Sequence, residues 1–200
     1  PEYDHVIIDE AHHLEEQATS QFGLEIGRQD VAAFLSTLSQ TGIEGPTGLL
    51  GRIPGLFDAF EVSEPVRQSI ADLIEHVREQ IDAAMRHLDL LFRTLTAFLE
   101  DYREPGRSSG AYDRTVRITP GLRVQPGWSD IEICSDNLAL PLKQIVQGLD
   151  QVSAWITRLP DEQDQLKYDL LLEVKSQFQR GSEIYHGLNH ILLEPNDDFV

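Results

Sequence analysis

The chain has 200 residues, 40% of them hydrophobic, and a formal net charge of −18. This length is enough for one or two domains with a core. No apolar stretch reaches the roughly 18–20 residues that cross a bilayer, so we expect no membrane contact. No signal-peptide pattern opens the sequence, and Cys134 is the only cysteine, which excludes an internal disulfide and favours a cytoplasmic location.

The first predicted element is a short buried strand over residues 3–8, and a helix is expected from Glu10 to about Ser20. Asp30 is the expected N-cap of the next helix, whose apolar positions recur at helical spacing: Val31, Phe34, Leu35 and Leu38. Residues 41–60 are rich in Gly and Pro and predict a loop with at most short helical turns.

The clearest signal is a heptad pattern that predicts a helix of about 38 residues, roughly 57 Å long, after an N-cap at Ser63. Its apolar positions alternate in steps of four and three: Ile70, Ile74, Val77, Ile81, Ala84, Leu88, Leu91, Leu95, Phe98 and Tyr102. Further apolar residues widen this stripe, which predicts packing against more than one neighbouring helix.

Residues at about 111–134 predict a small β element, because short extended runs alternate with two Pro-Gly pairs. A helix is expected from about Asn137 to Arg158, with Asp136 as its cap and Pro141 near its first turn. Its apolar face is Leu138, Leu142, Ile145, Leu149, Val152 and Ile156.

A last helix is expected from about Asp161 to Leu193, with Gly181 and Gly187 as candidate interruptions. Its apolar positions are Leu170, Leu171, Val174, Phe178, Tyr185, Leu188 and Leu192. The predicted fold is therefore mainly α: a long helical hairpin or bundle with a small β insertion, flanked by strand stubs of a parent α/β motor domain. We expect three parts, residues 1–20, 21–193 and 194–200, and an excised or processed fragment, since the chain opens at Pro1 inside a strand.

The candidate catalytic residues lie in the opening stretch of the sequence. The aliphatic run Val6-Ile7-Ile8 leads directly into Asp9 and Glu10, the arrangement that a Walker B element requires at the edge of a sheet. One carboxylate can hold Mg²⁺ through water, and the next can polarise the water that attacks a γ-phosphate. The alternative is structural, since acidic residues also favour the N-terminus of a helix.

The stretch "YDHVIIDEAHHLEE" resembles motif II of the superfamily 2 helicases, in the branch of XPD and DinG. This resemblance implies that Asp9 is the magnesium carboxylate, that Glu10 is the hydrolytic carboxylate, and that His12 couples nucleotide state to DNA binding. It also implies a helical arch inserted after motif II, with ATP and Mg²⁺ as cofactors of the parent and the remaining motor domains as its partners. The parent would move along single-stranded DNA in the 5′ to 3′ direction.

Parts of the family pattern lie outside this chain. The Walker A loop and any iron–sulfur cysteines precede motif II in such proteins, so a cluster is possible in the parent but not here. Motifs III to VI are missing as well. We therefore expect the isolated chain to be inactive.

Basic residues gather in one segment. Between Tyr102 and Trp128 there are two acidic residues and five arginines: Arg103, Arg107, Arg114, Arg117 and Arg123. Aromatic residues interleave with them, which is typical of surfaces that bind single-stranded nucleic acid. The alternative is that these arginines pair with nearby acids and that the aromatic residues belong to the core.

Two other functions stay open. The first is an acidic helical module for protein–protein interaction, with the negative charge as a solvated face. The second is a metal site in a helical bundle, because His and Glu residues three or four apart share a helix face. Its candidate ligands are His12, His13, Glu15 and Glu16, together with Glu183, His186 and His190.

Overall fold

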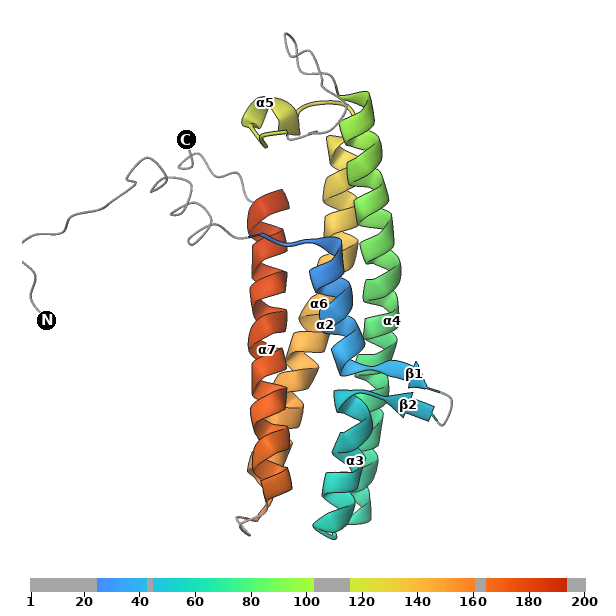
Figure 1. The fold of residues 1–200 in the computed structure, drawn as a ribbon, viewed down its shortest axis with the longest axis vertical. Helices are drawn as coiled ribbons and strands as arrows, with labels where there is room; N and C mark the ends of the chain where they lie inside the picture. Colours follow the sequence, from blue (N-terminus) through green and yellow to red (C-terminus); the bar gives the residue numbers. More distant parts are fainter. Residues whose placement is uncertain (1–24, 43–44, 103–115, 161–164, 194–200) are drawn as a thin grey trace, which may run out of the picture.

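The computed structural model describes residues 25–42, 45–102, 116–160 and 165–193, which form a helical bundle (Figure 1). Along the chain these are α2 (Arg28–Leu38), β1 (Gln40–Gly42), β2 (Gly45–Thr47), α3 (Leu49–Ala59), α4 (Glu64–Asp101), α5 (Pro120–Arg123), α6 (Trp128–Thr157) and α7 (Gln165–Leu192). The predicted fold class, a mainly α bundle with long helices, is confirmed. The predicted strands over residues 3–8 and 194–200 lie outside the described residues.

The bundle has four helical positions, and α2 and α3 share one of them. In Figure 1, α2 lies above α3 on the same side of α4, and both contact α4 and α7. Helices α4 and α6 run antiparallel, since Thr94 contacts Cys134 at one level and Val77 faces Gly148 at another. Helix α7 then returns along α6. The result is an up-and-down four-helix arrangement around one continuous hydrophobic core.

Helix α4 confirms the heptad prediction. It spans 38 residues from Glu64, and Ser63 is its N-cap, whose carbonyl accepts the backbone N–H of Val66 at 3.0 Å. Eight of the ten predicted positions are buried, and Leu95 and Tyr102 are partly buried. The wide stripe is explained by its neighbours, because α4 contacts α2, α3 and α6.

The prediction of a loop over residues 41–60 was wrong. A short hairpin of β1 and β2 precedes an 11-residue helix, α3, which contains Pro54. The helix forms because five apolar side chains at helical spacing are buried against α4 and α7: Leu49, Leu50, Ile53, Leu56 and Phe57. Gly48 starts this helix with a φ of 90°, and a Cβ there would lie 2.8 Å from the carbonyl oxygen of Leu38.

The predicted β element at about 111–134 was also wrong over its described part. Residues 120–123 form α5, and Thr119 caps it by accepting the N–H of Leu122. Helix α6 begins at Trp128, so the predicted start near Asn137 and the cap at Asp136 were wrong. In this helix Ile131 is buried, while Ile133 is 58% exposed.

Smaller corrections concern helix ends and glycines. Gly27, not Asp30, is the N-cap of α2, and the Asp30 carboxylate accepts the Gly27 N–H at 2.9 Å. Pro141 lies inside α6 rather than in its first turn. Helix α7 runs without a break through Gly181 and Gly187. The predicted apolar faces of α2, α6 and α7 all point into the core.

Candidate functional site

The residues to which the sequence assigns nucleotide chemistry, Asp9, Glu10 and His12, lie outside the described residues. So do the metal-ligand candidates between His12 and Glu16, and three of the five arginines: Arg103, Arg107 and Arg114. The structure instead describes the bundle that follows the motif and two of the arginines, Arg117 and Arg123. Arg117 is exposed just before α5.

Arg123 holds α5 against the end of α7. Its Nη1 donates to the carbonyl oxygen of Leu192 at 2.7 Å, and its Nη2 donates to that of Ile191 at 3.4 Å. The last carbonyls of a helix have no partner within the helix and carry partial negative charge, so a guanidinium both caps them and stabilises the helix dipole. Its predicted contact with nucleic acid stays a prediction, but its guanidinium already has a structural role.

Trp128 belongs to the core. It is 2% exposed, its ring packs edge-on against Phe98 with centroids 5.6 Å apart, and its Nε1 donates to Glu132 at 3.1 Å. The Arg123 guanidinium lies 5.5 Å from the centre of the same ring. Trp128 is therefore packed between neighbours and does not present a face on which a base could stack.

The histidines of α7 form no metal site within the described part of the chain. Glu183, His186 and His190 are all exposed on this helix. Among the described residues, no group of three His, Cys, Asp or Glu side chains is placed to hold a metal ion. The ring of His186 instead packs edge-on against Tyr185, with centroids 5.0 Å apart.

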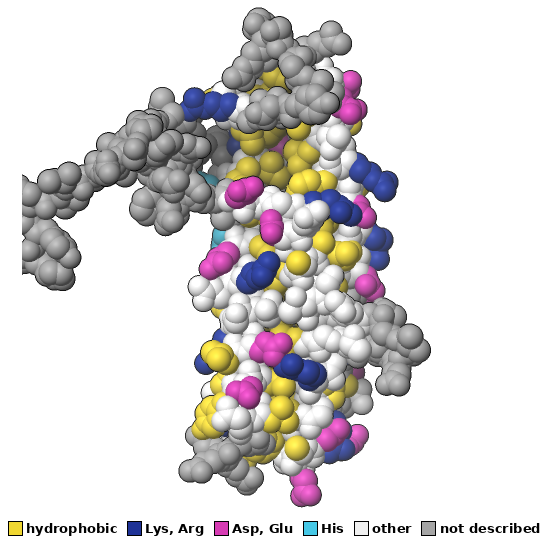
Figure 2. Space-filling model, in the orientation of Figure 1, with side chains coloured by type: hydrophobic (Ala, Val, Ile, Leu, Met, Phe, Trp, Pro, Cys, Tyr) yellow, Lys and Arg dark blue, Asp and Glu magenta, His cyan; other side chains and the backbone are white. Residues whose placement is uncertain are grey.

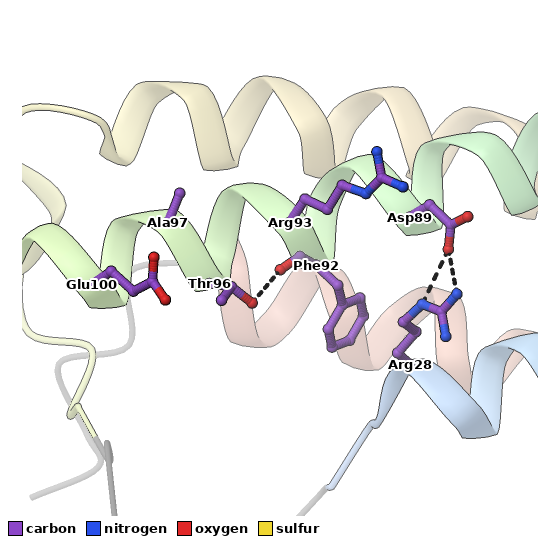
Figure 3. A pocket seen from close by; sticks show the side chains of 7 residues that line it. All are labelled: Arg28, Asp89, Phe92, Arg93, Thr96, Ala97 and Glu100. Atoms are coloured by element: carbon purple, nitrogen blue, oxygen red, sulfur yellow. Dashed lines mark hydrogen bonds and ion pairs between the residues drawn. The ribbon is translucent and has the colours of Figure 1, made fainter. Parts of the chain in front are cut away.

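A groove lies on the surface of the bundle along α4, and Figure 3 shows it from close by. It has a volume of about 430 Å³ and follows α4 beyond the point where α2 begins. Its lining residues on α4 recur every three or four positions, so they occupy one face of the helix. They are Asp89, Phe92, Arg93, Thr96, Ala97 and Glu100, joined by Arg28 from the first turn of α2.

An ion pair lies at the end of this groove where α2 begins. The Nε of Arg28 lies 3.0 Å and its Nη2 lies 2.6 Å from the same carboxylate oxygen of Asp89 (Figure 3). Both side chains are about half exposed, so the pair contributes about 0–1 kcal/mol to stability. It lies at the level along α4 at which α2 begins.

Beyond this ion pair, toward the end of α4, the groove has a partly buried aromatic ring at its base and polar side chains along its edges. The ring of Phe92 is partly buried and points down beside the start of α2, and the hydroxyl of Thr96 donates to the Phe92 carbonyl at 2.8 Å. Arg93 is exposed and pairs with no acidic side chain in the described part of the chain. In Figure 2, hydrophobic side chains gather on the upper part of this face, above the level at which α2 begins.

Comparisons of the chain with family models, with curated proteins and with solved structures found no match. Among the described helices, none is both long enough and apolar enough to cross a membrane.

Sequence reasoning did not find the groove. Arg28 and Asp89 are 61 residues apart, and nothing in the local pattern indicates that they meet. The one available signal was Phe92, a large apolar side chain at the edge of the heptad stripe of α4.

Proposed function

We propose that this chain comprises motif II and the arch of an ATP-dependent DNA helicase of the XPD/DinG type. The parent hydrolyses ATP and moves along single-stranded DNA, 5′ to 3′, while the arch helps to enclose the strand. The observation that carries the proposal is the sequence Asp9-Glu10-Ala11-His12, set directly after an aliphatic run and directly before a long helical bundle.

The shape of the bundle is compatible with an insertion into another domain. An inserted unit has to leave its host and return to it at neighbouring points, as inserted domains generally do. Helix α2 begins and α7 ends in the upper half of the bundle, and these two helices contact each other (Figure 1). This supports the proposal without depending on any residue of motif II.

In the proposed mechanism the two carboxylates act at different atoms. Asp9 would hold a magnesium ion through water when ATP is bound, and the parent would anchor the ATP with its own phosphate-binding loop. Glu10 orients and polarises the water that attacks the γ-phosphate, and it takes up the proton of that water. His12, three residues after Asp9 in the sequence, would couple the state of the nucleotide to DNA binding.

The proposed DNA contact lies at the upper end of the bundle, where α4 ends and α5 begins. The arginines of this segment supply positive charge in a chain that otherwise repels phosphate, because its net charge is −18. Of the two described arginines, Arg117 is exposed, and Arg123 caps α7.

Replacing Glu10 by Gln in the parent tests the hydrolytic role. Gln keeps the shape of the side chain but cannot take up a proton, so we expect ATP turnover to fall by about 100-fold or more. Nucleotide affinity should stay within about threefold, since Asp9 still serves the magnesium ion. Steady-state ATPase rates and nucleotide binding by fluorescence would measure both.

Glu16→Gln is the matched control, since it removes the same charge six residues further along at a position without a role in the helicase proposal. It should keep normal turnover. A Glu10→Gln parent that hydrolyses ATP at the normal rate would remove Glu10 from the mechanism and, with it, the helicase proposal.

The second candidate function is an acidic module for protein–protein interaction. It is favoured by the net charge of −18 and by the groove along α4, whose described lining is open to solvent. This function requires neither motif II chemistry nor DNA, so the Glu10→Gln experiment separates it from the helicase.

A further inference from the structure

Helix α6 has a second stripe of side chains, which lies outside the bundle core. The helix contacts α4 and α7 along its length and α5 near its start, and no other described element makes more than marginal contact with it. The outer stripe recurs in steps of four and three residues, as the core positions of the helix do, so it occupies one face. A stripe at this spacing is suited to receive another helix. Its members are Ile133, Asn137, Leu140, Gln144, Gln147 and Gln151.

The outer stripe is open to solvent and uncharged. None of its side chains is buried, and none carries a charge, although a quarter of the residues in the chain do. Ile133 is 58% and Leu140 is 61% exposed. Leu90 of α4, which is 48% exposed, lies on the same side of the bundle, because it is one turn before Thr94, and Thr94 contacts Cys134 of α6. Three large apolar side chains therefore gather in one region of the surface, and such a patch marks an interaction site.

We propose that the outer stripe pairs with the outer stripe of a second copy of the chain, with the two α6 helices antiparallel. The argument is charge complementarity along one edge of the stripe. Asp136 and Lys143 lie on this edge, since each comes directly before a stripe residue, and both are exposed and without an ion pair within the described residues. In an antiparallel pair related by a two-fold axis, the same edge of both helices meets. An axis midway between residues 136 and 143 therefore places Asp136 of each copy beside Lys143 of the other.

The same axis also brings apolar side chains together. It passes between residues 139 and 140, so the Leu140 side chains of the two copies meet in the middle of the uncharged surface. An axis midway between Lys143 and Asp150 also pairs opposite charges, but it places Leu140 opposite the polar Ser153. A parallel pairing sets the charged edge against the other edge of the stripe, which has no charge. That edge consists of three buried residues, Cys134, Pro141 and Gly148.

The net charge opposes association, and the position of the interface limits this effect. Two copies that each carry −18 repel each other. The proposed pairing, however, places no like charges opposite each other along α6, and repulsion between more distant charges is screened beyond about 8 Å at physiological ionic strength. The inference does not depend on the proposed function. If both hold, two parent molecules associate through their arches.

Sedimentation velocity of the isolated chain tests the pairing. Over a series from about 1 to about 300 µM at physiological ionic strength, the mass should rise from 22.6 kDa toward twice that value. Leu140→Asp should raise the dissociation constant of the dimer at least about tenfold, because each dimer loses two buried leucines and sets two carboxylates side by side. Leu172→Asp is the matched control, since Leu172 is an exposed leucine of α7, and it should change the constant by less than about twofold. Both variants should keep the circular dichroism spectrum of the unchanged chain, because both positions are exposed.

A charge exchange then tests the register. Asp136→Lys alone should weaken the dimer about fivefold, because it sets a lysine of each copy against Lys143 of the other, and adding Lys143→Asp should restore the dissociation constant to within about twofold. A combined variant that stays as weak as Asp136→Lys would overturn this register. Equal effects of Leu140→Asp and Leu172→Asp would overturn the interface. A chain that stays monomeric over the whole series would overturn the proposal and leave the outer stripe to a different protein.

Discussion

At the scale of single residues, Arg123 illustrates how one side chain can serve the fold at a position that also suits nucleic acid. Its guanidinium meets two carbonyls at the end of α7 and lies over the buried Trp128. A charged donor at a helix C-terminus stabilises the helix both by capping it and by opposing its dipole. A variant that removes Arg123 would therefore destabilise the bundle, so a loss of DNA binding in that variant would not by itself indicate a DNA contact.

Arg123→Ala should lower the free energy of unfolding of the isolated chain by about 1–3 kcal/mol, since hydrogen bonds to charged groups contribute about that much. Arg86→Ala is the matched control and should change it by less than about 0.5 kcal/mol, because Arg86 is exposed on α4. Urea denaturation followed by circular dichroism measures both. Equal stabilities would show that water replaces the guanidinium at the end of α7 without cost.

At the scale of elements, the close approach of α4 and α6 depends on a glycine. Gly148 lies in the middle of α6 and faces Val77 of α4, and a Cβ at this position would overlap the Val77 side chain. Glycine has a low helix propensity, but at this position its missing side chain lets two long helices approach each other closely. Gly55 in α3 is different, since a Cβ there would meet no atom within 4 Å.

Gly148→Ala should therefore destabilise the chain by about 1–3 kcal/mol through overpacking, although alanine is the better helix former. Gly55→Ala makes the same substitution in open space and should stabilise by about 0.5–1 kcal/mol. Thermal and urea unfolding of the two variants would measure whether each substitution raises or lowers the free energy of unfolding. Adding Val77→Ala to Gly148→Ala should recover part of the loss. A stabilising effect of Gly148→Ala alone would mean that α4 and α6 are not held at this distance.

At the scale of the whole molecule, the described residues form a helical bundle with a surface groove, and they include no phosphate-binding loop. Gly48, within the Gly-rich segment of residues 41–60, starts α3, and Arg52 in the first turns of that helix pairs with Glu173 of α7. Gly48 thus serves the start of α3, and Arg52 links α3 to α7. In the proposed helicase, Asp9 and Glu10 would depend on the rest of a motor domain to anchor the ATP.

The isolated chain should neither bind ATP specifically nor hydrolyse it. Two carboxylates without a cradle of backbone N–H groups leave the triphosphate unanchored, and the net charge of −18 repels it. Isothermal titration calorimetry with Mg·ATP should show no saturable heat, and the full-length parent serves as the positive control. Micromolar binding by the isolated chain would show that it is not a fragment of the proposed kind.

The sequence by itself determined the helices α2, α4, α6 and α7 and most of their buried faces. The reason is that a helix buries every third or fourth residue, so the pattern of α4 from Ile70 to Phe98 is visible without any knowledge of its neighbours. The same logic predicted the core positions of α6 and α7. The candidate chemistry of Asp9 and Glu10 also comes from local sequence alone.

The tertiary structure alone decided the features that depend on distant partners. Helix α3 forms despite Pro54 and several glycines because α4 and α7 bury its apolar face. Arg28 and Asp89, which line the groove, meet across 61 residues, and the end of α7 is capped because Arg123 reaches Leu192 across 69 residues. Local periodicity carries no information about such pairs, since their energy appears only when the packed helices bring the two side chains together.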